Sequence, residues 1–187
     1  MDERGFTLWF TGLSGAGKTT IANNVEPPSF DNTIAALDGS GRDLVRVALL
    51  FHNLAASETS PALQAVEREM SPRMAAHHSA VYLNARLFAR VDALHGQRAL
   101  QKLTPEQLRL LDRVHLDFVL AGARLSAAAK TRMGEIVERL ARLTTQFTQN
   151  VLADESSYEL VLEDERDLAG LPDFVRAAAA EAAEEGP

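Results

Sequence analysis

The fold is decided by residues 104–154, which read TPEQLRLLDRVHLDFVLAGARLSAAAKTRMGEIVERLARLTTQFTQNVLAD. Two helical patterns follow one another in this stretch. The first opens with Thr104 and Gln107, which are typical of a capping box, and with a proline at the first helical position between them. Gly122 interrupts the pattern, and Ser126 can cap the helix that follows. The sequence therefore predicts two consecutive long helices here.

Apolar residues of the second helix fall on one face. They follow a 4-3-4-3-4-4 spacing, which is the period of an amphipathic helix, and charged residues lie mostly on the other face. At roughly 1.5–3 kcal/mol per large buried side chain, this face contributes about 10 kcal/mol before entropy is subtracted. We therefore expect partner helices of the chain to cover it. The face consists of Ala129, Met133, Ile136, Leu140, Leu143, Phe147 and Val151.

The rest of the chain repeats helical patterns. Ser60 and Pro61 mark the start of another helix, which Pro72 is expected to end or kink. An alanine-rich helix begins at Asp173, and residues 158–162 are typical of a strand. We predict a mainly α protein: a multi-helix array with long antiparallel helices, plus a short N-terminal strand–loop–helix appendage.

Composition excludes several classes of protein. The chain has 187 residues, a hydrophobic fraction of 46% and a net charge of −7, which argues against a nucleic-acid partner. It has no cysteine, which excludes disulfides and thiolate metal sites and favours a cytoplasmic location. No apolar run reaches the roughly 20 residues of a membrane span, and the N-terminus is not a signal peptide. We expect neither a membrane nor nucleic acid as partner.

Glycines and a lysine near the N-terminus form a phosphate-binding loop pattern. Residues 12–19 fit G-x-x-x-x-G-K-[ST], with a β-type run before them and a helix after them. Glycines let backbone N–H groups turn toward phosphate oxygens, Lys18 would reach the β- and γ-phosphates, and the Thr19 hydroxyl would hold Mg²⁺. The candidate nucleotide-binding residues are Gly12, Ser14, Gly15, Ala16, Gly17, Lys18, Thr19 and Thr20.

The α/β scaffold that such a loop requires is not evident in the sequence. The helix after Lys18 must end before Pro27 and Pro28. A nucleotide-binding domain needs several parallel strands with helices on both faces, and no later strand ending in aspartate offers a second Mg²⁺ contact. A working nucleotide site and a glycine-rich loop that binds nothing are the two alternatives.

Residues 5–22 read GFTLWFTGLSGAGKTTIA. This stretch, to about residue 26, closely resembles the start of adenylylsulfate kinase, a family that phosphorylates the 3′-hydroxyl of adenylylsulfate with MgATP. The resemblance implies MgATP binding at the loop.

Beyond residue 27, six segments carry a second resemblance. They are SFDNTI (29–34), LQAVE (63–67), VYLN (81–84), HLDF (115–118), FTQNV (147–151) and LAGLPD (168–173). In this order they resemble the N-terminal helical region of bacterial peptidyl-dipeptidases, in the thimet-oligopeptidase family of zinc metallopeptidases. The resemblance implies a largely helical fold with a deep channel for short peptides, of which this part would form one wall or lid.

The zinc chemistry of that family needs His-Glu-x-x-His, in which two imidazoles bind the metal and the glutamate activates water. No histidine of this chain is followed directly by a glutamate. We therefore expect no zinc ligands, no catalytic residue and no peptidase activity from this chain alone. Surface or helix-capping roles are expected for His52, His77, His78, His95 and His115.

These patterns predict two domains. Residues 1–26 would be an adenylylsulfate kinase-like P-loop fragment, and residues 27–187 a truncated helical domain of peptidyl-dipeptidase type. The junction fits a gene-fragment fusion, an engineered chimera or a sequence-assembly error. Two alternatives to a peptidase fragment stand beside it: an ATP-binding protein of sulfate assimilation, and a non-catalytic helical module that self-associates through apolar helix faces.

Overall fold

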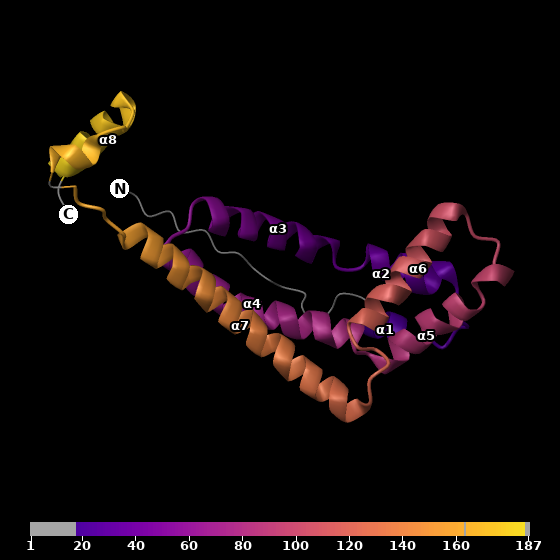
Figure 1. Cartoon of the computed structure of the whole chain (residues 1–187). Coiled ribbons are helices and arrows are strands. Elements are labelled where there is room, and N and C mark those ends of the chain that lie inside the picture. Colours follow the sequence, from indigo (N-terminus) through magenta and orange to yellow (C-terminus); the bar gives the residue numbers. More distant parts are fainter. Residues whose placement is uncertain (1–17, 163, 186–187) are drawn as a thin grey trace, which may run out of the picture. The chain divides into compact units, whose positions relative to one another are not determined.

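A computed structural model describes residues 18–162 and 164–185, and these residues form helices joined by turns (Figure 1). The prediction of a mainly α protein is confirmed. The chain divides into two compact units, Met1–Gln149 and Asn150–Pro187. The expected N-terminal strand and loop residues 12–17 lie outside the described residues. The helical elements are α1 (Lys18–Ala22), η1 (Phe30–Ala35, a π-helical turn), α2 (Ala36–Gly39), α3 (Arg42–Ser57), α4 (Pro61–Tyr82), α5 (Ala85–Gly96), η2 (Arg98–Leu100), α6 (Pro105–Leu120), α7 (Ala127–Ser157), η3 (Glu165–Leu168) and α8 (Asp173–Glu185).

Helices α5 and α6 form the centre of the first unit, and they lie side by side in Figure 1. Local rules define their starts. The Asn84 side chain accepts hydrogen bonds from the first-turn N–H groups of α5. Thr104 and Gln107 form the expected capping box of α6. The core between these helices and α1 and η1 contains Ile21, Ala22, Ile34, Leu87, Val91, Leu94, Leu111, Phe118 and Ala123.

The short helix α1 is part of this core. Ile21 is only 6% exposed, and α1 lies against α5. Arg90 of α5 is also buried, and its guanidinium donates to the carbonyl oxygens of Asn24 and Glu26 at 3.0 and 2.9 Å and to Oδ1 of Asn32 at 2.8 Å. A buried guanidinium needs such acceptors to offset its desolvation. Arg90 therefore holds the segment that leads from α1 to η1.

Helix α4 begins as expected, because Ser60 accepts a hydrogen bond from the N–H of Leu63. Of the two effects expected of Pro72, an end or a kink, the helix does not end there, since α4 continues through the proline to Tyr82. A proline inside a helix costs about 3 kcal/mol, which neighbouring contacts can offset. Here Met70 is buried beside the proline and Ser71 bonds to α7.

Helix α7 runs antiparallel to α4, as predicted. Thr145 donates to Ser71 at 2.9 Å, and Gln149 donates to the Gln64 carbonyl at 3.1 Å. The turn before α7 uses Gly122, whose φ of +100° favours glycine and whose Cβ would meet Leu125 at 2.7 Å.

The expected burial of the apolar face of α7 is wrong. Leu140, Leu143 and Phe147 are 56%, 50% and 68% exposed. The physical reason is that α7 contacts α4 through polar side chains, including Thr145 and Gln149, which lie on a different face of the helix. The side chains of Leu140, Leu143 and Phe147, called the leucine stripe below, are therefore accessible to solvent in the first unit.

In the second unit, the alanine-rich helix is present as α8, but the strand prediction is wrong. Residues 158–162 form no strand, and no described segment pairs with them. A β-type run becomes a strand only where a partner completes its hydrogen-bond ladder. Asp164 then caps the short helix η3 through the N–H of Arg166.

We predict that Arg90→Ala destabilises the first unit by about 2–4 kcal/mol, because three acceptors lose their buried donor. The matched control is Arg86→Ala, one turn earlier on α5, which removes an exposed hydrogen bond to Asn23 and should change stability by about 0.5 kcal/mol or less. Urea unfolding followed by circular dichroism measures both changes. Equal effects of the two substitutions would contradict the role assigned to Arg90.

Candidate functional site

The predicted nucleotide-binding residues fall at the edge of the described structure. Gly12, Ser14, Gly15, Ala16 and Gly17 lie outside it, while Lys18, Thr19 and Thr20 begin α1. Thr20 is exposed and lines an open hollow with residues 23–26. The geometry of the loop therefore stays a prediction.

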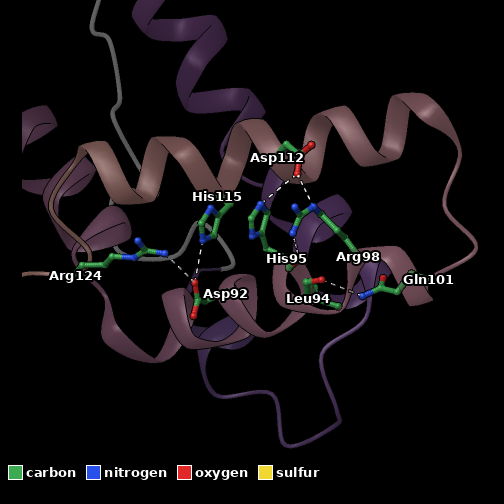
Figure 2. Close-up of polar contacts among 8 residues, drawn as sticks. All are labelled: Asp92, Leu94, His95, Arg98, Gln101, Asp112, His115 and Arg124. Carbon is green, nitrogen blue, oxygen red and sulfur yellow. Dashed lines mark hydrogen bonds and ion pairs between the residues drawn. The ribbon is translucent and has the colours of Figure 1, made fainter.

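The described residues bring together a different polar cluster, on the facing sides of α5 and α6 (Figure 2). Asp92 and His95 lie three residues apart on α5, and Asp112 and His115 lie three residues apart on α6. Residues at this spacing share a helix face. Because the two helices are antiparallel, the aspartate of each pair meets the histidine of the other.

The distances define two crossed histidine–carboxylate pairs. Nε2 of His115 lies 2.9 Å from Oδ1 of Asp92, and Nε2 of His95 lies 3.3 Å from Oδ1 of Asp112. The two imidazole rings stack with centroids 3.7 Å apart and an interplanar angle of 3°. Phe88 also stacks with the His115 ring, and their centroids are 5.9 Å apart. The cluster thus ties α5 to α6 through polar groups at the margin of the apolar core.

Two arginines complete the cluster at its exposed ends. Arg124 lies 3.7 Å from Asp92, and Arg98 lies 3.6 Å from Asp112. Each carboxylate therefore faces one histidine and one arginine. The His115 side chain is 10% exposed, whereas both aspartates are about half exposed, so the charges face solvent and the His115 ring does not.

These surroundings shift two pKa values. The hydrogen bond from His115, together with the Arg124 charge, holds the pKa of Asp92 below its usual range. Burial lowers the pKa of His95, and the nearby charges of His115 and Arg98 lower it further. The folded state therefore favours a neutral His95 and an ionised Asp92.

Chemically, this arrangement consists of two histidine–carboxylate contacts that join two helices. Nε2 of His115 faces Asp92 and Nε2 of His95 faces Asp112, so the two imidazole nitrogens do not converge on one point. Among residues 18–162 and 164–185, no group of three or more His, Cys, Asp or Glu side chains is placed to hold a metal ion. No helix of the same residues is long and apolar enough to cross a bilayer.

The surface or capping role expected for every histidine is wrong for His115, which is buried and paired. The sequence does carry a signal for it, the repeated Asp-x-x-His at residues 92–95 and 112–115. The spacing within each segment does not reveal that the two segments contact each other. Elsewhere, His78 stacks on Tyr82, and His52 lines a groove beside Phe51.

Comparisons with known proteins confirm both resemblances. The sequence model of the adenylylsulphate kinase family matches residues 4–91. A probable adenylyl-sulfate kinase of Synechocystis is 49% identical over 51 residues, which cover 26% of this chain and 27% of that protein. The dipeptidyl carboxypeptidase of Escherichia coli K12 is 42% identical over 165 residues, which cover 88% of this chain and 24% of the enzyme. Oligopeptidase A of Haemophilus influenzae is 29% identical over 169 residues, 89% of this chain and 25% of that protein. The chain thus spans about a quarter of the length of the curated relatives it matches.

We predict that the first unit loses stability as the pH falls from 7.5 to 5.5. The folded pKa of His95 is lowered, so the unfolded chain binds a proton near pH 6.5 more readily than the folded one. His95→Gln keeps a donor for Asp112 but does not titrate, so it should flatten this dependence. Urea midpoints at several pH values measure the effect.

The control for this experiment is His52→Gln on α3, which leaves the cluster intact and should retain the wild-type pH dependence. An identical loss of stability on acidification in His95→Gln and wild type would show that His95 does not cause it.

Proposed function

We propose that residues 27–187 form a helical, non-catalytic part of a zinc-dependent peptidyl-dipeptidase. The observation that carries the proposal is the 42% identity to the dipeptidyl carboxypeptidase of Escherichia coli over 165 residues. The matched oligopeptidase A proteins support the same assignment. In this proposal the antiparallel helices α4 and α7 contribute one wall of a channel that admits short peptides.

The histidines in the described part of the chain do not fit a zinc site. Two imidazoles must converge on one metal with nitrogen–zinc distances of about 2.0–2.1 Å. The His95 and His115 rings instead stack in parallel, and each Nε2 faces an aspartate of the opposite helix. In this proposal the chain therefore shapes the peptide site, and hydrolysis depends on groups outside it.

A chimera tests this proposal. Residues 27–187 replace the corresponding part of the Escherichia coli dipeptidyl carboxypeptidase, and release of dipeptides from a short N-blocked peptide is measured with added Zn²⁺. We expect the chimera to cleave and a chelator to abolish cleavage. A control chimera with Leu111→Asp, which places a charge in the core between α5 and α6, should lose activity.

The isolated chain is tested in the same cleavage assay. It should give no turnover above the blank, because it lacks the His-Glu-x-x-His motif. A chimera that folds but does not cleave would contradict the proposed role, and chelator-sensitive cleavage by the chain alone would contradict its non-catalytic character.

A second candidate function is ATP binding of the adenylylsulfate kinase type, in a cytoplasmic protein. The family match over residues 4–91 and the intact loop pattern at residues 12–19 support it. In the domain division that we propose, residues 1–26 carry the loop. The helix after it, α1, is packed in the core of the first unit, so a nucleotide that binds there would stabilise that unit.

We predict that MgATP raises the thermal midpoint of the wild type if this second function holds. Ligand at 100 times its Kd adds about 2.7 kcal/mol to the folded state. Lys18→Ala should remove the rise without lowering the midpoint measured in the absence of nucleotide. An unchanged midpoint in the wild type would reject nucleotide binding by the loop.

A third candidate is a helical interaction module without chemistry of its own. The half-exposed side chains of Leu140, Leu143 and Phe147 favour it, because a contiguous apolar surface is typical of an interface. In that function the occupant would be a second copy of the chain, and the molecular mass in solution would rise with concentration.

A further inference from the structure

An apolar groove of about 350 Å³ lies between α3, α4 and α7 in the first unit. Phe51 and Met70 are buried in its lining, and Leu140 of α7 lines it while remaining 56% exposed. Methionine side chains adapt to aromatic neighbours and make favourable sulfur contacts with rings. The lining is therefore suited to a large apolar side chain, and to an aromatic ring above all.

The apolar surface continues beyond the groove along both flanking helices. On α7 the leucine stripe extends to Phe147, which is 68% exposed. On α3, Val45 and Leu49 are 55% and 66% exposed, and each lies one turn before a residue that lines the groove. Residues three or four apart are neighbours on a helix, so these side chains and the groove form one patch.

This patch is large enough for a dimer interface. The leucine stripe, Val45 and Leu49 together contribute five side chains that are 50–68% exposed. At about 100 Å² per side chain, they present roughly 500 Å² on each copy, as much as the largest patch of a typical monomer. A two-fold interface buries the patch twice, about 1,000 Å² in total, which is the area that a specific interface has to reach.

The spacing of the leucine stripe is symmetric about its middle. Leu140 lies three residues before Leu143, and Phe147 lies three residues after Thr144. If a second copy of α7 runs antiparallel with a two-fold axis between residues 143 and 144, Leu140 of each copy meets Phe147 of the other. The ring of Phe147 then lies at the level where the groove opens. A two-fold interface requires this self-complementarity, because the same patch serves both copies.

Charged residues beside the stripe favour the antiparallel direction. Arg139 and Gln146 are exposed and lie one turn from Leu143, on either side of it along the helix. At the antiparallel register, Arg139 of one copy lies within about 3 Å of Gln146 of the other along the axis, and the amide oxygen can accept a hydrogen bond from the guanidinium. The two Arg139 side chains are nine positions apart, about 13 Å, which exceeds the screening length of roughly 8 Å.

A parallel arrangement fits less well. It would place Arg139 of both copies at the same level, where like charges repel. It would also place the two Phe147 rings level with each other, one turn beyond the groove, so the groove would stay unfilled. The register of the stripe and the position of the groove thus point to one direction of packing.

We propose that a second copy of the chain occupies the groove, with the two α7 helices antiparallel. Phe147 of each copy enters the groove of the other and completes the apolar lining formed by Phe51, Met70 and Met74. The dimer rests on the candidate function as an interaction module, for which it names the occupant and the geometry. It needs neither the peptidase nor the ATP-binding function.

Sedimentation equilibrium of the full-length chain tests the dimer. We expect the wild type to approach the mass of two chains as its concentration rises. Leu143→Glu places two negative charges at the two-fold axis and should raise the Kd of the dimer at least tenfold. The matched control is Leu116→Glu on α6, which is 47% exposed, lies outside the groove lining and should leave the Kd unchanged. Phe147→Ala, which empties the groove, is the second variant should Leu143→Glu lose its helical circular dichroism.

Disulfide trapping tests the direction of packing, because the chain has no cysteine of its own. Leu140→Cys and Phe147→Cys chains are mixed and oxidised mildly. We expect mixed dimers in several-fold excess over dimers of either variant alone. Identical positions lie seven residues apart along the axis, about 10 Å, which is beyond the roughly 7 Å that a disulfide spans between Cα atoms.

The outcomes separate the dimer geometry from the interaction module itself. The mass of a single chain at every concentration would reject both. A dimer that Leu143→Glu and Phe147→Ala leave intact would retain the interaction module but overturn its placement on α7. Disulfides that form between identical positions in preference to mixed ones would overturn the antiparallel arrangement.

Discussion

The first unit depends on the burial of one face of α5. Leu87, Val91 and Leu94 are 0–3% exposed and lie between α6, α1 and η1. Three such side chains contribute roughly 5–9 kcal/mol, a figure comparable to the net stability of a small domain. The neighbouring elements are short or separated in sequence, so they share α5 as their common support. Positions of α1, η1 and α6 thus follow from contacts to this helix.

Polar side chains of the same helix determine how its neighbours are aligned. Arg90 holds the carbonyl oxygens of Asn24 and Glu26, and the crossed pairs around Asp92 and His95 join α5 to α6. Apolar burial tolerates small sliding movements, whereas hydrogen bonds with fixed partners do not. The polar contacts also cross the proposed boundary near residue 26, since α1 and Arg90 share one core. The family match to adenylylsulphate kinase likewise extends past that boundary and ends within α5.

Among helices α3, α4 and α7, part of the apolar surface of the first unit is not buried. Their contacts are made by Phe51, Met70 and a set of hydrogen bonds around Thr145 and Gln149, and the leucine stripe of α7 is left accessible. An accessible stripe of this kind agrees with the proposed role as one part of a larger enzyme and also with the interaction module. In both cases the apolar face is where another segment binds.

Helix starts, the mainly α fold and the Gly122 turn could be predicted from the sequence, because caps and left-handed glycines depend on residues within one turn of the chain. The continuation of α4 through Pro72, the unpaired segment at 158–162 and the exposed face of α7 could not, because each depends on which element lies opposite. The histidine–carboxylate cluster also depends on which element lies opposite. Its Asp-x-x-His spacing is visible in the sequence, but only the antiparallel packing of α5 on α6 brings His115 to Asp92. Local hydrogen bonding was therefore determined by the sequence itself, while burial and long-range pairing were decided by the tertiary structure, since both are properties of two segments at once.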